Sequence, residues 1–184
     1  FAGYSLIAIG CAKMMGIELM ENFRRPYFAT SVADFWRKWH ISLSTWFRDY
    51  VYFPCGGSRC STIKTYRNLM ITFLVSGLWH GAAYNFILWG GYHGINQVLG
   101  RVLNPIKDFF RKILYIGDES IIRRILDIII TFCLVAYGWM IFYAPDMHFI
   151  VDVTRGYFKL GSPYIHQTTI FFFLIGFSML LYKD

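Results

Sequence analysis

The longest uncharged stretch of the chain lies between Arg67 and Arg101, with no Lys, Arg, Asp or Glu between these two residues. About 20 consecutive apolar residues cross the hydrocarbon core of a bilayer, so this stretch is long enough to span a membrane. As a single helix its apolar run would be about 40 Å long, which exceeds a core of ~30 Å. We therefore expect a tilted or broken helix, with breaks at the glycines around His80 and His93.

Other apolar stretches predict further membrane elements. Residues 1–20 are expected to form a membrane-embedded helix, and residues 121–144 and 164–182 are expected to form spans. Asn104-Pro105 is expected to end the helix of the central stretch, because proline interrupts helices. Residues 146–162 are expected to form a connector with a short amphipathic piece.

The segment from about Val32 to Tyr50 has apolar residues at helical spacing. Ser31 can cap its start, and Asp34 stands at the capping-box position three residues later. At 100° per residue, six apolar side chains share an arc of roughly 100°: Trp36, Trp39, Leu43, Trp46, Phe47 and Tyr50. The opposite face carries cations that we expect to meet headgroups or the cytoplasm: Arg37, Lys38 and Arg48. Such a helix lies in the membrane interface.

The central stretch contains two similar glycine motifs. Gly77-Leu-Trp-His80-Gly81 is followed by Gly90-Gly-Tyr-His93-Gly94, and each places a histidine just before its second glycine. Small residues four apart let membrane helices approach closely. We therefore expect close helix–helix packing at these glycines.

Composition agrees with a membrane protein. The 184 residues are 56% hydrophobic and 16% charged, against about 25% charged in soluble domains. We predict an all-α, polytopic membrane protein with a single membrane domain over residues 1–184. Because the chain begins at Phe1, inside an apolar stretch, we expect it to be the C-terminal part of a longer protein.

The net charge of +7 is concentrated at the junctions between apolar runs. This pattern favours contact with anionic lipid headgroups. A nucleic-acid partner is excluded, since it would need a continuous basic face on a soluble fold.

The four cysteines give no metal signature. Cys55 and Cys60 share a short loop, where a zinc site would need a second pair of ligands. We predict free thiols and no bound metal, and a disulfide would require an oxidising compartment. Cys11 and Cys133 lie in apolar runs and are expected to be buried.

Of the five histidines, His80 is the strongest candidate for chemistry. It lies deep in the uncharged stretch, where apolar surroundings favour the neutral imidazole that a general base needs. The alternative is a structural hydrogen bond to a neighbouring helix. His40, at the edge of the aromatic face beside Ser44, could converge on the same cavity.

The other three histidines are expected to play no catalytic part. On one continuous helix His93 would point about 220° away from His80, so a satisfied buried histidine is the favoured interpretation. His148 and His166 are expected to be ordinary interfacial residues.

The sequence lacks a Gly-x-Ser-x-Gly elbow, an H-E-x-x-H helix, a phosphate loop and a dinucleotide fingerprint. What it offers is a histidine base among hydroxyl and aromatic side chains. That combination suits acyl transfer from a thioester to an alcohol, in which the base takes the hydroxyl proton. We predict two catalytic residues, His80 and His40. The residues expected to bind substrate are Trp39, Ser44, Ser76, Trp79 and Asn85.

Long motifs resemble the membrane-bound O-acyltransferase family. They are Phe35-Trp-Arg-Lys-Trp-His-Ile-Ser-Leu-Ser-Thr-Trp-Phe-Arg-Asp-Tyr50, Gly56-Gly-Ser and Asn68 through Ser76-Gly-Leu-Trp-His-Gly81. Glu21-Asn-Phe-Arg-Arg-Pro-Tyr27 and Gly3-Tyr-Ser5 are similar to its bacterial branch for alginate O-acetylation and D-alanyl transfer. The resemblance covers residues 1–101 and continues more loosely to Ala144. Leu6 and Cys55 depart from the pattern of the branch.

The resemblance implies a helical, multi-pass fold with interfacial and broken helices around a central funnel. It also implies that His80 and His40 match the two family histidines. The donor would be a cytoplasmic thioester, either acetyl-CoA or an acyl-carrier protein, with no tightly bound cofactor. The acceptor would be a hydroxyl of an extracytoplasmic polysaccharide, or an extracytoplasmic acetyltransferase that relays the acyl group.

Three functions stay open from the sequence. Acetylation of an alginate-like exopolysaccharide at the inner, cytoplasmic membrane is the first. D-alanyl transfer toward teichoic acid is the second. A non-catalytic membrane carrier is the third, and it would be indicated by charged residues along a path. We expect an aromatic, uncharged lining instead.

Overall fold

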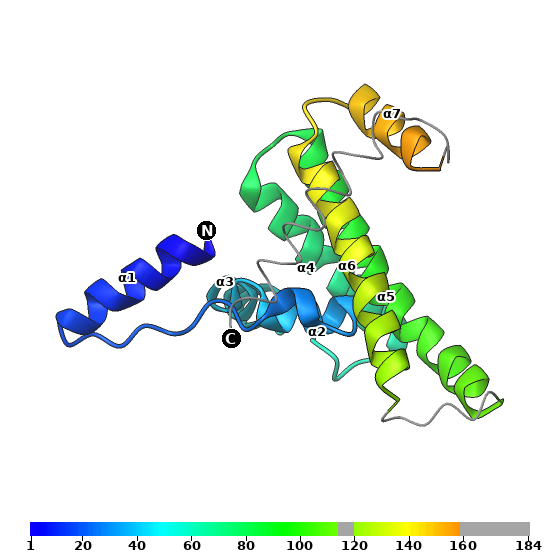
Figure 1. Ribbon diagram of the computed structural model, residues 1–184, viewed down its shortest axis with the longest axis horizontal. Coiled ribbons are helices and arrows are strands. Elements are labelled where there is room, and N and C mark those ends of the chain that lie inside the picture. The colour runs from blue at the N-terminus through cyan, green and yellow to red at the C-terminus, as the bar shows by residue number, and fades with distance from the viewer. Residues whose placement is uncertain (114–119, 159–184) are drawn as a thin grey trace. The chain divides into compact units, whose positions relative to one another are not determined.

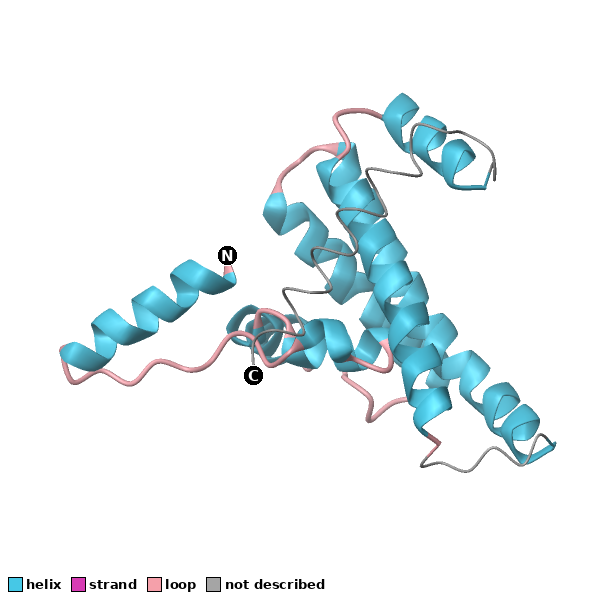
Figure 2. Cartoon of the chain, viewed as in Figure 1, coloured by secondary structure: helices cyan, strands magenta, loops and turns pink. Residues whose placement is uncertain are grey.

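The computed structural model describes residues 1–113 and 120–158 (Figure 1). Contacts within the chain define two compact units, Phe1–Tyr143 and Ala144–Asp184. All named elements in the described residues are helical: α1 (Ala2–Met14), η1 (Pro26–Phe28), α2 (Val32–Lys38), α3 (Ile41–Phe47), η2 (Arg48–Tyr52), α4 (Thr62–His80), α5 (Tyr84–Ile113), α6 (Ile121–Tyr143) and α7 (Met147–Phe158). No strand occurs in this part of the chain, as Figure 2 shows, which agrees with the predicted all-α class. The predicted span over 164–182, and His166 within it, lie outside the described residues.

The segment after Ser31 is two short helices and not the single helix predicted over 32–50. Ser31 caps α2 as expected, because its hydroxyl accepts a hydrogen bond from the backbone N–H of Asp34 at 3.1 Å. The chain then breaks at His40, whose backbone is left-handed with φ 43° and ψ 59°. The break divides the predicted aromatic face, so that Trp39 packs inside while Trp46 is 49% exposed.

Backbone hydrogen bonds from outside the segment hold this break open. The N–H of Arg24 donates to the carbonyl of Lys38 at 3.0 Å, and the N–H of Ile41 donates to the carbonyl of Asn22 at 3.0 Å. The connector before η1 therefore runs alongside residues 38–41 and pairs with groups that a continuous helix would have used internally. These tertiary bonds offset the cost of a left-handed histidine.

Helices α4 and α5 form a hairpin that breaks the central stretch at Gly81, whose φ is 156°. The predicted break at this glycine is confirmed, whereas the one at His93 is wrong because α5 continues through it. The two helices approach closely at glycines, as predicted: a Cβ on Gly77 would collide with the carbonyl of Phe86, and a Cβ on Gly90 with that of Phe73.

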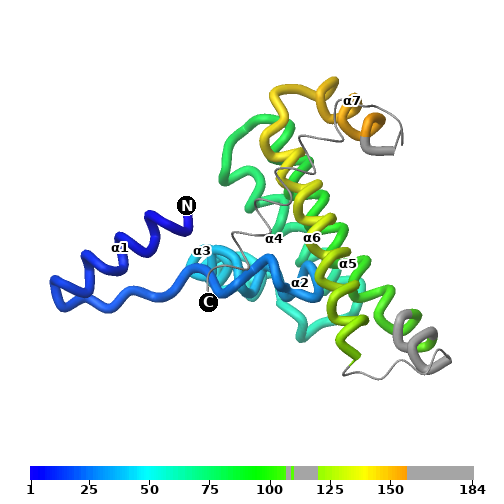
Figure 3. The backbone as a smooth tube through the Cα atoms, viewed as in Figure 1, coloured from blue at the N-terminus to red at the C-terminus, as the bar shows by residue number. Residues whose placement is uncertain are grey.

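Helix α6 lies along α5, as the tube in Figure 3 shows. Among the described residues it is the one helix long and apolar enough to cross a membrane. Its bounds, Ile121–Tyr143, agree with the span predicted over 121–144. The expected end of the preceding helix at Asn104-Pro105 is wrong, because Pro105 lies inside α5.

Four further predictions have different outcomes. The first helix ends at Met14 and not near residue 20. Cys11 and Cys133 are exposed on the isolated chain, contrary to the expected burial. Helix α7 supplies the short helical piece predicted within 146–162. The single membrane domain over 1–184 stays a prediction.

Aromatic side chains build the core where α2, α5 and α6 meet. Ala29, Phe35 and Val135 are buried there, and partly buried aromatics pack around them: Tyr27, Trp36, Trp39 and Trp139. Trp89 of α5 is 1% exposed. This aromatic layer forms one wall of the cavity that contains the predicted catalytic histidines.

Candidate active site

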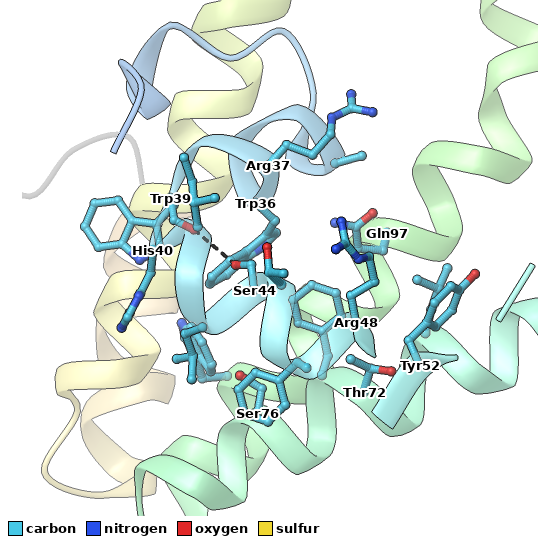
Figure 4. A pocket seen from close by; sticks show the side chains of 18 of the residues that line it. Trp36, Arg37, Trp39, His40, Ser44, Arg48, Tyr52, Thr72, Ser76 and Gln97 are labelled. Atoms are coloured by element: carbon cyan, nitrogen blue, oxygen red, sulfur yellow. Dashed lines mark hydrogen bonds between the residues drawn. The ribbon is translucent and has the colours of Figure 1, made fainter. Parts of the chain in front are cut away.

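A cavity of about 1090 Å³ opens within the first unit, between α2, α3, η2 and the helices α4 to α6. Both predicted catalytic histidines line it, together with three of the residues expected to bind substrate: Trp39, Ser44 and Ser76. Figure 4 shows Trp39, His40, Ser44 and Ser76, which come from segments far apart in the sequence, around one space. The fold therefore places around one cavity residues that sequence analysis identified only as individual candidates.

His40 owes its position to the break between α2 and α3. Its ring packs against Phe1 with centroids 4.7 Å apart, and its Nδ1 lies 3.4 Å from the hydroxyl of Ser42. That hydroxyl donates its single proton to Oδ1 of Asn22 at 2.6 Å. In the neutral ring, Nδ1 of His40 therefore carries the proton and donates to Ser42. Nε2 then has the lone pair that is available to accept a hydrogen bond.

Electrostatics favours the neutral form of His40. Burial lowers its pKa from the ordinary value of 6.5, and the proximity of His80 lowers it further. Both histidines line the same cavity. A neutral imidazole with a free Nε2 can accept a proton or a hydrogen bond from a hydroxyl.

His80 is the last residue of α4, immediately before the break at Gly81. Its ring is enclosed by aromatic rings, with Trp79 at 4.9 Å, Phe142 at 5.0 Å and Trp89 at 5.2 Å between centroids. No side chain or backbone group among the described residues hydrogen-bonds to it. The alternative of a structural hydrogen bond to a neighbouring helix thus finds no partner in this part of the chain, and the ring nitrogens are free for a substrate.

His93 is buried behind the cavity and does not line it, with 1% of its surface exposed. The indole N–H of Trp36 donates to its Nδ1 at 3.4 Å. Because the chain breaks at Gly81, both His80 and His93 contact the same ring, that of Trp89, at 5.2 and 5.1 Å. His93 thus contacts two aromatic residues of the cavity wall, Trp36 and Trp89. The assumption of one continuous helix did not predict these contacts.

The residues expected to bind substrate occupy different positions. The hydroxyl of Ser44 donates to the carbonyl of Trp39 at 3.1 Å, and Ser76 is buried at the cavity wall. Trp79 is 57% exposed and does not line the cavity, although it touches His80. Asn85 also lies outside the lining, and its side chain donates to the carbonyl of Phe142 at 2.7 Å. Its visible role is to join α5 to α6.

The expectation of an uncharged lining is wrong. Four arginines contribute to it: Arg24, Arg37, Arg48 and Arg101. Sequence reasoning placed Arg37 and Arg48 on an outer face because it assumed one straight helix. No aspartate or glutamate among the described residues lines the cavity. The same residues contain no group of three His, Cys, Asp or Glu side chains that could hold a metal ion.

Comparison with known proteins identifies the family of the chain. Residues 1–111, which contain both cavity histidines, match the model of the membrane-bound O-acyltransferase family. The chain belongs to that family, and the protein is therefore a membrane protein.

Individual relatives lie in the branch expected from the motifs. A probable alginate O-acetylase AlgI from Pseudomonas aeruginosa is 44% identical over 171 residues, which cover 88% of this chain and 29% of the relative. A peptidoglycan O-acetyltransferase from Helicobacter pylori is 37% identical, with 88% and 29% covered. A teichoic acid D-alanyltransferase from Bacillus subtilis is 36% identical, with 80% and 38% covered. The chain thus spans less than two fifths of the length of these relatives.

Proposed function

We propose that the protein to which this chain belongs is an O-acyltransferase that moves an acetyl group from a thioester to a hydroxyl of an extracytoplasmic polysaccharide. The observation that carries the proposal is the pair His40 and His80 facing one cavity, with the His80 ring free of hydrogen bonds from the described residues. The cavity is lined by aromatic rings, hydroxyl groups and four arginines, and a histidine with free ring nitrogens beside hydroxyl groups suits acyl transfer.

In the proposed reaction, the hydroxyl oxygen of the acceptor attacks the thioester carbonyl carbon. His80 takes the hydroxyl proton as the new C–O bond forms. The C–S bond then breaks, and the imidazolium returns the proton to the departing thiolate, so that ester and thiol are released and His80 is neutral again. His40, with Nε2 as its free lone pair, orients the acceptor by accepting a hydrogen bond. Trp39, Ser44 and Ser76 shape the cavity around the reacting groups.

The remaining features of the proposal concern setting and partners. The family name supports a membrane location, and we propose the inner, cytoplasmic membrane with several helices crossing it around a funnel. The donor is acetyl-CoA or an acyl-carrier protein on the cytoplasmic side, and no cofactor is tightly bound. The acceptor is an alginate-like exopolysaccharide, reached directly or through an extracytoplasmic acetyltransferase.

D-alanyl transfer toward teichoic acid is the second candidate. It is supported by the teichoic acid D-alanyltransferases among the relatives, which match at 36% and 32% identity against 44% for the first alginate O-acetylase. A non-catalytic carrier is the third, and the arginines in the lining are the feature that favours it. A histidine enclosed by aromatic rings and open to substrate favours catalysis over carriage.

The test compares histidine variants in the full-length protein. His80→Ala should reduce transfer of labelled acetyl to polymer in membranes by about 10²–10⁴-fold, the usual contribution of a general base. His148→Ala, on the exposed surface of α7, is the matched control and should be near neutral. His166→Ala is also expected to be near neutral. Wild-type rates from His80→Ala at matched protein level would refute the mechanism.

The acceptor is tested separately. Mass spectrometry of surface glycans from wild-type and deletion strains should show loss of O-acetyl groups from an exopolysaccharide. Loss of D-alanine from teichoic acid instead would select the second candidate.

A further inference from the structure

His93 is a buried histidine that the proposed mechanism does not use. Its ring contacts three rings that line the cavity: Trp36 with centroids 5.0 Å apart, Trp89 at 5.1 Å and Phe73 at 6.3 Å. Trp36 and Trp89 also contact each other, at 5.5 Å. His93, Trp36 and Trp89 therefore form a closed triangle of rings behind the cavity, which we call the His93 triangle.

One hydrogen bond joins two corners of the His93 triangle. The indole N–H of Trp36 on α2 donates to Nδ1 of His93 on α5 at 3.4 Å. Ring contacts alone leave the rings some freedom to slide and tilt, whereas a hydrogen bond has a preferred length and angle. The bond therefore limits how the His93 ring can turn against Trp89.

The second ring nitrogen of His93 shows that the ring is held from one side only. Because Nδ1 accepts a hydrogen bond, the proton of the neutral ring is on Nε2. Nε2 is buried without a hydrogen-bond partner in the described residues. Since buried polar groups are nearly always paired, this unpaired N–H lowers stability. An apolar side chain would avoid that cost, so what His93 contributes is the acceptor for Trp36.

The orientation of His80 depends on ring contacts. A catalytic histidine is usually oriented by a hydrogen bond to its second ring nitrogen, and the described residues provide none for His80. Instead, the rings of Trp89 and Phe142 stand at 88° to its ring, with centroids at 5.2 and 5.0 Å. The indole N–H of Trp89 is itself buried without a partner in this part of the chain. The position of Trp89 is therefore set by the rings around it, His93 among them.

The His93 ring also sets the approach of α6. A Cβ on Gly138 would lie 2.5 Å from Nε2 of His93 and 3.0 Å from Cε1, so the backbone of α6 lies directly against the ring. Phe142 follows Gly138 by one helical turn on α6 and contacts His80. Both rings that stand perpendicular to His80 are thus connected to His93, Trp89 through the triangle and Phe142 through α6.

We propose that His93 is a positioning residue, whose hydrogen bond with Trp36 fixes Trp89 and thereby the orientation of the His80 imidazole. The assignment rests on the proposed acyltransferase function and adds a residue that acts on its chemical step. His93 does not line the cavity, so it acts on the rate of chemistry and not on substrate binding. A misplacement of about 1 Å at a catalytic group can cost 10²-fold in rate.

The test compares two substitutions of nearly the same shape in the purified full-length protein. His93→Asn keeps an acceptor near the position of Nδ1, and His93→Leu removes it. Each is also made together with Trp36→Phe, which removes the donor. Gly138→Ala displaces the ring from the side of α6. The controls are His148→Asn on the exposed surface of α7 and Gly100→Ala, whose Cβ would have no neighbour within 4 Å.

His93→Leu should lower kcat for transfer of labelled acetyl to polymer by about 10- to 100-fold, with KM for donor and acceptor unchanged. His93→Asn should keep a higher kcat than His93→Leu. With Trp36→Phe present, the two should become equal, because the acceptor then has no donor to pair with. Gly138→Ala should lower kcat as well, and both controls should keep the wild-type value.

A second measurement does not depend on turnover. Diethyl pyrocarbonate modifies accessible neutral imidazoles, and mass spectrometry of peptides follows its rate at His80. If the His93 triangle holds the His80 nitrogens toward the cavity, this rate should fall in His93→Leu and Gly138→Ala. It should stay at the wild-type value in His148→Asn. Thermal unfolding of each variant in the same detergent reports the folded fraction.

Several outcomes would overturn the assignment. If His93→Leu lowers only the unfolding temperature while the folded enzyme keeps its kcat, His93 has a structural role alone. Equal kcat for His93→Asn and His93→Leu in the presence of Trp36 would exclude the hydrogen bond as the cause. A raised KM with unchanged kcat would assign His93 to substrate binding.

The measurements also separate this assignment from the proposed function. A wild type that transfers no acyl group, but whose modification at His80 still depends on His93, would refute the proposed function and leave the positioning role intact. Active wild type with His80 modification and kcat both independent of His93 would refute the positioning role alone. If His93→Leu does not fold, Gly138→Ala against Gly100→Ala decides the same question.

Discussion

The close approach of α4 and α5 can be tested with a single methyl group. A Cβ on Gly90 would collide with the carbonyl oxygen of Phe73 and lie 3.3 Å from the Cα of Leu74. These are backbone atoms of the facing helix, so the helices must separate to accept the methyl. Overpacking a well-packed contact costs about 1–3 kcal/mol. Alanine in place of glycine within a helix recovers about 0.5–1 kcal/mol. We therefore expect Gly90→Ala to destabilise the protein by about 1–2 kcal/mol net.

The neighbouring glycines provide matched controls on the same helix. A Cβ on Gly91 would meet only the side chain of Leu74 at 3.8 Å, and one on Gly100 would have no neighbour within 4 Å. Both Gly91→Ala and Gly100→Ala should leave stability unchanged or raise it by about 0.5–1 kcal/mol, from helix propensity alone. Replacing glycine by alanine is thus expected to lower the stability at Gly90 and to preserve or raise it at Gly91.

Stability is measured by thermal unfolding of the purified full-length variants in one detergent. Acyl transfer is measured below the unfolding range. Because separating the helices moves Trp89 away from His80, Gly90→Ala should also lose transfer while it is still folded. If Gly90→Ala is as stable and as active as Gly91→Ala, the helices do not meet at this glycine and the α4–α5 contact is wrong.

Three other predictions follow from the site and its support. Trp39→Ala should lower the folded yield, because the ring stacks on Phe35 at 5.6 Å; a wild-type yield in size-exclusion chromatography would contradict this. A double Cys55→Ser, Cys60→Ser variant of the full-length protein should keep its activity, whereas lost activity together with stoichiometric bound zinc would show a metal site. Because burial and the proximity of His80 lower the pKa of His40 from its ordinary value of 6.5, the ratio of wild-type to His40→Ala transfer rates should fall on acidification with a midpoint below pH 6.5. A midpoint at or above pH 6.5 would contradict the lowered pKa of His40.

Local sequence signals predicted the features that depend on neighbouring residues. The cap of α2 at Ser31 needs only a hydroxyl three residues before a backbone N–H. The close packing at Gly77 and Gly90 follows from side chains small enough to let two helices meet. The apolar length of α6 follows from composition alone. The motifs around His40 and His80 were long enough to indicate the family.

Tertiary contacts decided the break at His40 and what the cavity contains. Nothing local to residues 32–50 opposes one continuous helix; the break at His40 exists because Asn22 and Arg24 pair with the backbone on either side of it. That break turned Arg48 from an outer face into the cavity lining. The break at Gly81 likewise placed His80 and His93 against the same ring of Trp89. Periodicity assumes an unbroken helix, so it could select the histidines but could not predict which residues they would face.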